Sequence, residues 1–577
     1  MLHPKKSLLV FICFYISLSS IHSQDLEQIG GPLMTLKGNV TVGSSFYNAW
    51  NRENSRSPFS YFITANPTFS IYGFDIPVSL TYRDQQGSIS NPFNRISFNP
   101  SYKWISLNLG KFTKSLSTYS LSGQVVKGVA VDLNPGKFRL SVVRGSIVNS
   151  FIQLDTILNE LAPLPSYKRN TIGGRIGVGS NRNFIDLIVF KAKDDFNSID
   201  QSGNNLELNR PQENIVIGTA FGISPAKWLS FKADLNASAH TANQESQDYL
   251  ISNDIDDLRD DFGSVLTLNH STKLQFAVES KLNFKFKRFG FGAEYRRVDP
   301  LYKSLGAFYF QEDFENFLFK TNFSLLQGKV RFNGRGGIQR NNLNNLRKYR
   351  DTRRIINTNL TIMPSRNFTI AARYSNFQTD RTPGLVAVND SIRLATTTGG
   401  IGITPRYSFG TKEKRSTIVL GYNRQNLTDL LAEEDSGKDI VNDIVNLSYS
   451  INLKPKETRV SLSLVGNRNQ VRDIERNRLG INLAYSKKVA DNKLQLNVGV
   501  GGFQNYRDGF SEGFSVSGRV GARYKLEKST SISTMINFVN RSGTSGYQEI
   551  RGNINATYRF PDVSTSKINK KNAPTSK

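Results

Sequence analysis

Cysteine is almost absent from this 577-residue chain, and its single occurrence, Cys13, lies near the start. Lys5 and Lys6 precede an apolar run there, and small or polar residues follow it, which is the pattern of a secretory signal peptide. We predict that residues 1–23 form this signal peptide and that cleavage occurs before Gln24. The exported chain would then lack disulfides and thiolate metal ligands, so packing and backbone pairing alone must hold its fold together.

Long apolar runs are also missing. After residue 23 no run reaches the ~20 residues that a membrane-spanning helix needs, and the mean hydropathy is −0.38. By hydropathy alone the chain is a soluble protein. The strands of a membrane barrel are not detected by this test, because roughly half of their residues face a polar lumen.

Histidine is scarce, since only His240 and His270 remain after the predicted signal peptide. Ser238 and His240 allow the hypothesis of a hydrolase dyad, but histidine close to serine in an exposed loop is far more common than such a dyad. The glycines of residues 399–402 lie within a strand-like run, so they predict close packing rather than a nucleotide site. We therefore expect neither enzyme activity nor a cofactor.

Period-2 alternation is the pattern that the sequence has in abundance. In residues 550–560 the even positions are apolar or small, from Ile550 to Phe560, whereas the odd positions are polar or basic, from Arg551 to Arg559. The same alternation occurs in residues 273–287, 444–453, 493–500 and 514–524, and helical spacing fits none of these runs. Strands with one apolar face form either a solvated sheet or the wall of a membrane barrel.

Short and long breaks between these strands take turns along the chain. Residues 134–137, 363–367 and 526–529 are short breaks, whereas 148–168, 241–271 and 428–439 are long. This order is typical of an up-and-down antiparallel barrel with tight periplasmic turns and longer outer loops. We count about eleven strands in residues 36–240 and about fifteen in 272–560, which predicts an all-β transmembrane barrel of about 26 strands, within about 22 to 28. Residues 305–310 break the order of turns, so we assign them to an outer loop.

Four short turns share a proline, then a basic residue, then an aromatic residue. Proline presets the turn, while the base and the aromatic ring suit the membrane surface. Ordinary proline hairpins are the alternative, but four occurrences in the short class favour an aromatic girdle at residues 99–104, 134–138, 224–228 and 363–368.

The last strand-like run is expected to close the barrel against the first strand near Leu36, so that no strand edge is left open in lipid. Tyr558 and Phe560 resemble the terminal aromatic signal by which outer-membrane barrels are recognised for insertion. An even strand number puts both termini in the periplasm. We predict one barrel over residues 24–560, without a plug domain because only a short segment precedes the first strand, and a polar periplasmic tail over 561–577.

Taken together, these features resemble outer-membrane β-barrel proteins of the Bacteroidetes type. Residues 91–139, with the motifs Asn-Pro-Phe-Asn and Leu-Asn-Pro-Gly-Lys-Phe-Arg, are similar to segments of uncharacterised members of that group. The resemblance implies a place in the outer membrane, contact with its lipid and lipopolysaccharide, and insertion by the barrel-assembly machinery. It implies no particular chemistry.

The formal net charge of +27 indicates an acidic partner, and export makes anionic lipid or anionic solutes better candidates than nucleic acid. Basic residues fall on the face predicted to line the lumen, where rings of Arg and Lys lower the barrier for anions. The equally weighted alternative is a polar lumen filled with partly ion-paired side chains. The predicted pore-lining residues are Lys281, Lys285, Arg331, Arg335, Arg519, Arg523, Arg551 and Arg559.

Acidic residues cluster in the long break of residues 241–271. Five carboxylates could hold a calcium ion, which binds carboxylate oxygens, but the spacing lacks the glycine and distal glutamate of an EF-hand. A solvated acidic loop is therefore the favoured interpretation of Asp254, Asp256, Asp257, Asp260 and Asp261.

Two functional hypotheses follow. The first is a porin-like channel for polar or anionic solutes with a basic lumen. The alternative is a non-transport barrel, acting as subunit or scaffold of an outer-membrane assembly or secretion complex with outer-membrane protein partners. A receptor with an N-terminal plug is disfavoured, because too few residues precede the first strand.

Overall fold

The computed structural model describes most of the chain as strands and short connections. The predicted signal peptide and the predicted polar tail lie outside the described residues, which are 34–71, 74–84, 95–150, 166–199, 210–246, 266–307, 311–347, 349–383, 394–429, 439–471, 473–543 and 546–560.

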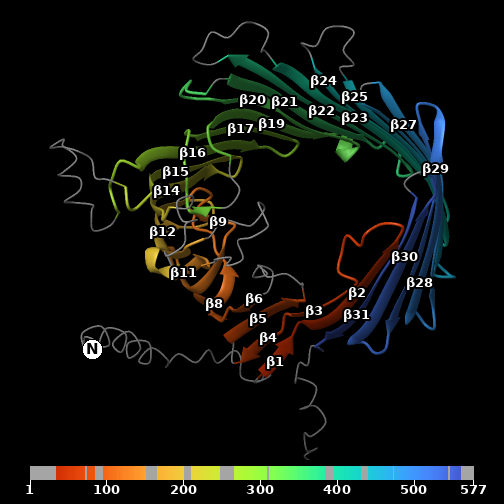
Figure 1. The fold of residues 1–577 in the computed structure, drawn as a ribbon, viewed down its shortest axis with the longest axis horizontal. Helices are drawn as coiled ribbons and strands as arrows, with labels where there is room; N and C mark the ends of the chain where they lie inside the picture. Colours follow the sequence, from red (N-terminus) through yellow and green to blue (C-terminus); the bar gives the residue numbers. More distant parts are fainter. Residues whose placement is uncertain are drawn as a thin grey trace, which may run out of the picture.

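A single antiparallel sheet of 29 strands closes on itself to form the barrel (Figure 1). Three barrel strands are interrupted and count as two labelled strands each, namely β1 with β2, β3 with β4, and β6 with β7, so the wall has 26 strands. Eleven of these precede residue 242 and fifteen follow residue 271. The predicted all-β, 26-strand antiparallel barrel is therefore confirmed.

The wall strands of the first half are shorter than those of the second. In the first half they are β1 (Met34–Lys37), β2 (Asn39–Trp50), β3 (Phe59–Ala65), β4 (Thr68–Ile71), β5 (Phe74–Arg83), β6 (Arg95–Phe98), β7 (Ser101–Tyr102), β8 (Ile105–Thr113), β10 (Val125–Leu133), β11 (Phe138–Val148), β12 (Lys168–Gly179), β13 (Phe184–Asp195), β14 (Glu213–Ala226) and β15 (Leu229–Thr241). In the second half they are β16 (Thr272–Lys285), β17 (Phe289–Val298), β19 (Phe314–Leu325), β20 (Val330–Asn341), β21 (Tyr349–Ile362), β22 (Phe368–Pro383), β23 (Leu394–Gly410), β24 (Lys414–Asp429), β25 (Asp439–Leu453), β26 (Thr458–Val471), β27 (Ile474–Val489), β28 (Leu494–Arg507), β29 (Phe510–Lys525), β30 (Thr530–Arg541) and β31 (Tyr547–Arg559).

In the described part of the chain, two strands and two short helices lie outside the wall. Strands β9 (Leu121–Ser122) and β18 (Gly306–Ala307) pair in parallel with each other, and the 3-10 helices are η2 (Phe196–Ser198) and η4 (Leu326–Gly328). Among the described residues, no helix is long and apolar enough to cross a membrane.

The barrel closes between β31 and β2, as predicted. Their register runs from Asn39 opposite Arg559 to Trp50 opposite Gln548, and the Phe560 amide donates to the Gly38 carbonyl at 3.0 Å. Gly38 has a φ of +116°, and a Cβ there would lie 2.0 Å from the Asn66 carbonyl oxygen. Glycine at position 38 therefore allows the first strand to bend next to the seam.

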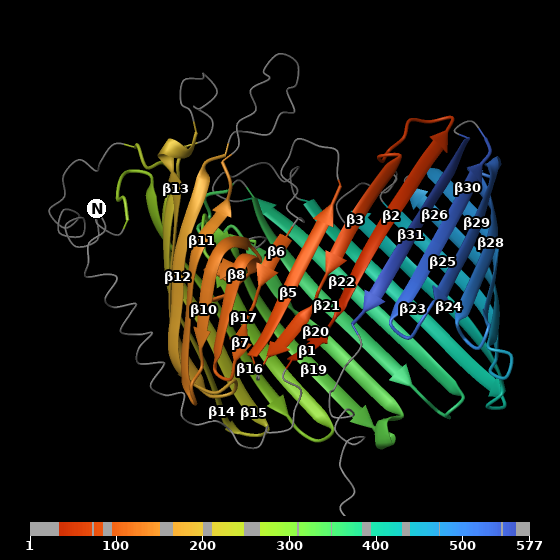
Figure 2. The ribbon, with the colours of Figure 1, turned by 90° about the horizontal axis from the view of Figure 1, so that it is seen from below.

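The outer surface of the wall is apolar, because residues of one parity expose their side chains on every strand. On β31, for example, Ile554 is 49% exposed and Tyr558 41%, and on β13 Leu187 is 59% exposed. Figure 2 shows these strands tilted across the wall. An exposed apolar belt around a closed sheet fits a lipid environment, where a sheet without open edges has no unpaired backbone groups.

Aromatic residues of the proline turns lie at the end of the barrel where the short turns gather. Trp104, Phe138 and Trp228 are exposed there, and Trp228 stacks against Phe284 and Phe286 with ring centroids 6.2 and 5.7 Å apart. This placement agrees with the predicted aromatic girdle.

The sequence assigns residues 305–307 to an outer loop, and they belong to the connection between β17 and β19 rather than to a wall strand, whereas residues 308–310 lie outside the described part. The connection does not extend away from the barrel. It folds into it, where β18 pairs with β9 inside the ring of strands (Figure 1).

Closure at the β31–β2 seam generates the first prediction. Phe560→Ala removes the aromatic ring that lies 5.3 Å from Tyr558 but leaves the backbone bond to Gly38 intact. If this ring is the insertion signal, we expect less heat-modifiable barrel in the outer-membrane fraction than for the wild type. Phe514→Ala, which removes an exposed ring from β29, is the control, and normal assembly of the Phe560 variant would remove the signal role.

Candidate functional site

The lumen of the barrel is the candidate site, and the strand register identifies which side chains face it. Residues paired across antiparallel strands lie on the same face of a sheet. Strand β9 lies inside the ring in Figure 1, and on the wall next to it Val143 and Phe190 are completely buried. Val143 and Phe190 therefore mark the inward face of their strands. The cross-strand pairs that continue from them around the wall identify the inward face of every other strand, which lies opposite the exposed apolar face.

All eight predicted pore-lining residues lie on this inward face. Lys281 and Lys285 are on β16, Arg331 and Arg335 on β20, Arg519 and Arg523 on β29, and Arg551 and Arg559 on β31. The structure brings the last four together, because Arg519 pairs with Asn537 and Asn537 pairs with Arg551. The other four lie on β16 and β20, so the eight residues form two groups rather than one ring.

Charge pairing differs between the two sides of the lumen. Lys281 forms an ion pair with Glu279, Arg139 with Asp186 at 3.2 Å, and Arg169 with Asp194 at 2.7 Å. Within the described part of the chain, the six predicted arginines make no ion pair, and Arg519 bonds only the amide oxygen of Asn537, at 2.9 Å. Arg335 interacts electrostatically with Glu294, which is bonded to Lys320, but none of the six arginines from β20 to β31 forms a direct ion pair with a described residue.

A hollow of about 370 Å³ lies in this arc, on the inward face of β21 to β25. Small residues such as Ala371, Gly402 and Gly421 form its floor, and Arg373 lies among them with its guanidinium bonded to the Asn423 amide oxygen at 3.0 Å. Glycine and alanine leave room that larger side chains would fill. A solute passing along this wall would meet one cation and several amide and hydroxyl groups.

The opposite wall is covered by two segments that we call the inner loops, residues 114–124 and 299–307. Their two short strands, β9 and β18, pair with each other, and the Tyr302 hydroxyl donates to the Tyr119 carbonyl at 3.0 Å. Bonds to the wall fix them in place: Arg296 donates to the Tyr119 hydroxyl at 2.7 Å, and Ser238 donates to the Lys303 carbonyl at 2.6 Å.

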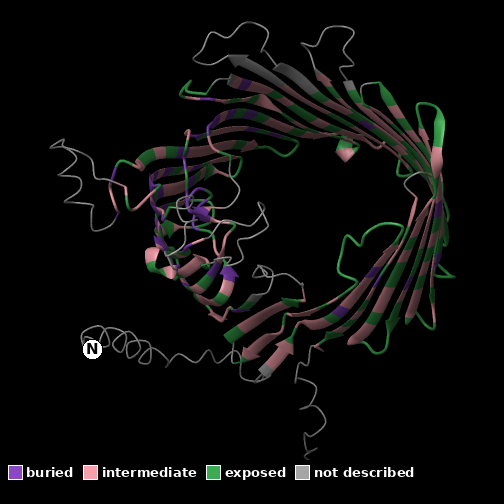
Figure 3. Ribbon diagram, in the orientation of Figure 1, coloured by how far each residue is buried: buried purple, intermediate pink, exposed green. Residues whose placement is uncertain are grey.

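Apolar packing holds the inner loops against the wall. Leu116, Leu121 and Leu305 from the loops pack into one cluster with wall residues of β8 to β14, and Tyr119 and Tyr302 pack into a second with Ala277, Val298 and Phe314. Figure 3 shows that buried positions concentrate around β9. Burial raises the pKa of both tyrosines and lowers the pKa of Lys303, whose ammonium group also lies near Arg169.

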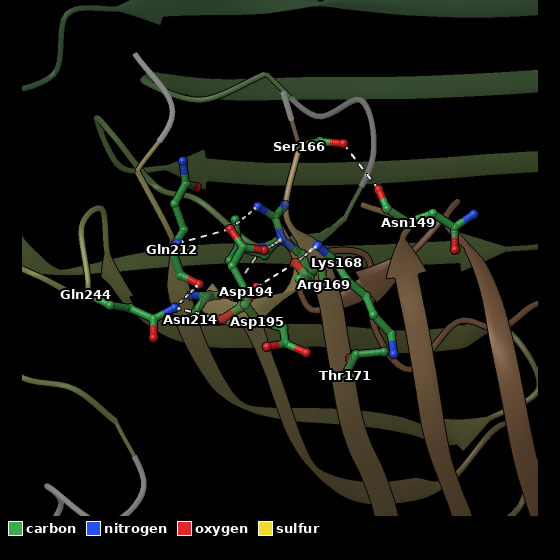
Figure 4. A network of polar contacts seen from close by, with 12 residues as sticks. Asn149, Ser166, Lys168, Arg169, Thr171, Asp194, Asp195, Gln212, Asn214 and Gln244 are labelled. Carbon is green, nitrogen blue, oxygen red and sulfur yellow. Dashed lines mark hydrogen bonds and ion pairs between the residues drawn. The ribbon is translucent and has the colours of Figure 1, made fainter. Parts of the chain in front are cut away.

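A polar network secures the long-loop end of this wall (Figure 4). The Asp194 carboxylate accepts two hydrogen bonds from the Arg169 guanidinium and one, at 3.0 Å, from the backbone amide of Gln212. Gln244 donates to the carbonyls of Asp194 and Gln212 at 3.1 and 3.0 Å. The connections next to β12, β13, β14 and β15 are thus bonded to one another where they leave the wall.

Sequence reasoning did not identify the inner loops or the wall beneath them. A signal was present in residues 184–192, where Ile185, Leu187 and Val189 alternate with Ile188 and Phe190 and make both faces apolar. A strand that is apolar on both faces is buried on both faces. Here the outer face meets lipid and the inner face meets the loops.

The other candidates are placed as follows. His240 lies on the inward face of β15, where its Nε2 is 3.3 Å from the Gln212 side-chain oxygen, and the Ser238 hydroxyl donates to Lys303 instead of to His240. The aspartates 254, 256, 257, 260 and 261 lie outside the described residues. Among the residues that are described, no group of three or more His, Cys, Asp or Glu is placed to hold a metal ion.

Comparison with solved structures returns other barrels at low identity. The translocation pore of the P pilus usher PapC aligns with 91% of this chain and 99% of its own, at 11% identity and a TM-score of 0.36. OpdQ of Pseudomonas aeruginosa aligns over 74% and 98% (11% identity, TM-score 0.31), and the ferric enterobactin receptor PfeA of the same organism over 90% and 80% (8% identity, TM-score 0.38). No family model and no curated protein matches the chain. All three TM-scores are below 0.5.

Packing of the inner loops generates the second prediction. A Cβ at Gly306 would lie 2.2 Å from the Phe190 ring and 2.7 Å from the Ser120 carbonyl oxygen, so Gly306→Val forces the loop off the wall at a cost of roughly 1 to 3 kcal/mol. We expect trypsin to cleave after Lys303 faster in this variant, while the barrel stays heat-modifiable.

The control is Gly518→Val, because a Cβ at position 518 meets nothing within 4 Å. Equal cleavage after Lys303 in the wild type and both variants would show that the loops are not held by this contact.

Proposed function

We propose that this protein is a porin-like channel of the bacterial outer membrane that passes polar and anionic solutes along the basic arc of its lumen. One observation carries the proposal: six inward arginines on β20, β29 and β31 form no ion pair in the described part of the chain, whereas Arg139, Arg169 and Lys281 on the opposite wall do.

The barrel's size supports a water-filled lumen. Barrels of roughly 16 to 18 strands already enclose an aqueous channel, and this one has 26. The inner loops lie against the β8–β17 wall in Figure 1, and the described connection between β2 and β3 also projects into the ring, near β2 and β30. The closed sheet and its exposed apolar belt support a membrane location, and the even strand number supports both termini on the short-turn, periplasmic side.

Arginine on the lumen wall supports a preference for anions. Unpaired guanidinium groups attract anions and repel cations at the distances of a pore wall, and they remain charged at any physiological pH. If these side chains served only to fill a polar lumen, partners of opposite charge would be expected beside them, as they are found near the inner loops.

A second candidate function is favoured by the inner loops themselves. Segments bonded and packed inside a barrel narrow it, which suits a barrel that serves as a subunit or scaffold of an outer-membrane complex. Co-purification with a stoichiometric partner, together with conductance that stays absent after Gly306→Val releases the loop, would favour this function over the channel.

The third prediction tests the channel. In planar bilayers with a potassium chloride gradient, the wild-type protein should show conductance with a reversal potential that indicates anion preference. Replacing Arg331, Arg335, Arg519 and Arg523 by Gln removes four positive charges from the wall, and we expect the anion-to-cation permeability ratio to fall at least about twofold.

Arg340→Gln with Arg424→Gln is the matched control, because both arginines face outward near the long-loop end of their strands. It should leave the reversal potential unchanged. Absence of wild-type conductance, or a cation preference, would contradict the proposed function.

A further inference from the structure

The outer surface of the barrel carries a basic groove on β10 to β13. It has a volume of about 610 Å³, and five of its ten lining residues are basic: Lys127, Arg144, Lys168, Lys191 and Lys193. Ser146 and Asn170 add a hydroxyl and an amide. All seven have the parity of the exposed apolar residues Val129, Val142, Ile172 and Val189, so their side chains point away from the lumen.

The groove lies near the long-loop end of the wall. Lys127 and Asn170 are the third residues of β10 and β12, Lys168 is the first residue of β12, and Arg144, Lys191 and Lys193 are within five residues of the ends of β11 and β13. A charged side chain facing lipid costs ~2 to 4 kcal/mol at the membrane midplane but only ~0 to 1 kcal/mol near the interface. The free-energy cost of these outward charges is therefore small only if the groove lies at the level of the lipid head groups.

Charge pairing distinguishes this groove from three other outward basic residues near the same end of the barrel. Arg340 donates to Glu315 at 2.6 Å, Arg468 forms an ion pair with Glu475 at 2.8 Å, and Arg424 lies 3.9 Å from Asp443. In the groove, Lys127, Arg144 and Lys168 form no ion pair with any residue that the structure describes.

Two carboxylates of the described residues, Glu213 and Asp195, border the groove. Glu213 lies 2.9 Å from the Lys191 ammonium and 3.5 Å from that of Lys193, but it is 1% exposed and also accepts two bonds from Thr267. Asp195 is the cross-strand partner of Lys168, and its carboxylate accepts a bond from the Asn197 amide at 3.2 Å. Among the described residues, five cations therefore face two carboxylates. The groove keeps a strong positive charge on a surface that otherwise meets lipid.

The cations are spread over several strands. Lys127, Ser146, Asn170 and Lys193 form one cross-strand row, and Arg144, Ile172 and Lys191 form the next. At about 4.8 Å between neighbouring strands, the first row spans about 14 Å. That span exceeds a single phosphate ion and suits a head group with several anionic oxygens, while Ile172 and Val189 extend below it toward the apolar belt.

We propose that this groove binds the phosphorylated glycolipid head group of the outer leaflet, the lipid A part of lipopolysaccharide. Its phosphate groups accept charge-assisted bonds from Lys127, Arg144 and Lys168, and Ser146 and Asn170 donate to phosphate or sugar oxygens. The acyl chains lie along the exposed apolar residues of β11 to β13. The site is on the outside of the wall, so it does not depend on the proposed channel.

The test measures lipid A binding to the purified, folded barrel in detergent by native mass spectrometry. The probes are phosphorylated lipid A, the same lipid A after dephosphorylation, and phosphatidylglycerol. We expect phosphorylated lipid A to bind the wild type with a preference over both other lipids. The triple variant with Lys127→Gln, Arg144→Gln and Lys168→Gln should bind it at least about tenfold more weakly, since each basic residue near a lipid surface contributes ~1 kcal/mol.

The matched control variant carries Arg340→Gln, Arg424→Gln and Arg468→Gln, which removes three outward basic residues of the same rim that have acidic partners. It should bind lipid A like the wild type, and both variants should keep heat-modifiability and wild-type conductance. Equal binding of phosphorylated and dephosphorylated lipid A to the wild type, or unchanged binding in the groove variant, would overturn the proposal. So would complete displacement of lipid A by inorganic phosphate, which would identify a general anion site, or occupancy of the groove by a co-purifying protein.

Discussion

Closure of the sheet is the constraint on which the rest of this structure depends. Each strand faces an apolar exterior on one side, where an unpaired backbone amide or carbonyl would have no water to bond. The chain meets this requirement by pairing β31 with β2 over their whole lengths, with Gly38 allowing the bend beside the seam. Once the ring is closed, alternation assigns every side chain either to the exterior or to the lumen.

The exterior and the lumen of the barrel then differ in composition. The exterior is uniformly apolar, with charges confined to the strand ends, whereas the lumen is divided. On the β8–β17 side, two connections fold inward and pack onto an apolar wall, so that Tyr119, Phe190 and Val143 are buried as in a globular core. On the β20–β31 side, the six predicted arginines face the lumen and form no ion pair with any residue that the structure describes. This division, rather than the basic composition alone, supports both a passage and its selectivity.

Basic residues have several distinct environments in this barrel, and three of them bear on function. Near the inner loops they neutralise buried carboxylates, as Arg139 and Arg169 do for Asp186 and Asp194. On the open arc of the lumen they face solvent, and on the outside of β10 to β13 they gather in a groove where lipid head groups lie. The basic residues of the chain are thus divided among buried ion pairs, the lumen wall and the outer groove.

Local pattern determined the wall of this protein. Period-2 alternation gave the inward parity of Arg335, Arg519 and Arg551, and the order of short and long breaks gave the strand number, because both depend on residues close in the chain. The closing pair followed from the requirement that a sheet in lipid has no open edge. Tertiary structure alone decided where the long connections go. Leu121 and Leu305 are 184 positions apart in the chain yet pack into one cluster inside the barrel. The groove likewise joins residues of four strands, and alternation does not reveal which outward cations have acidic partners, because contacts between distant segments are set only when the sheet has closed.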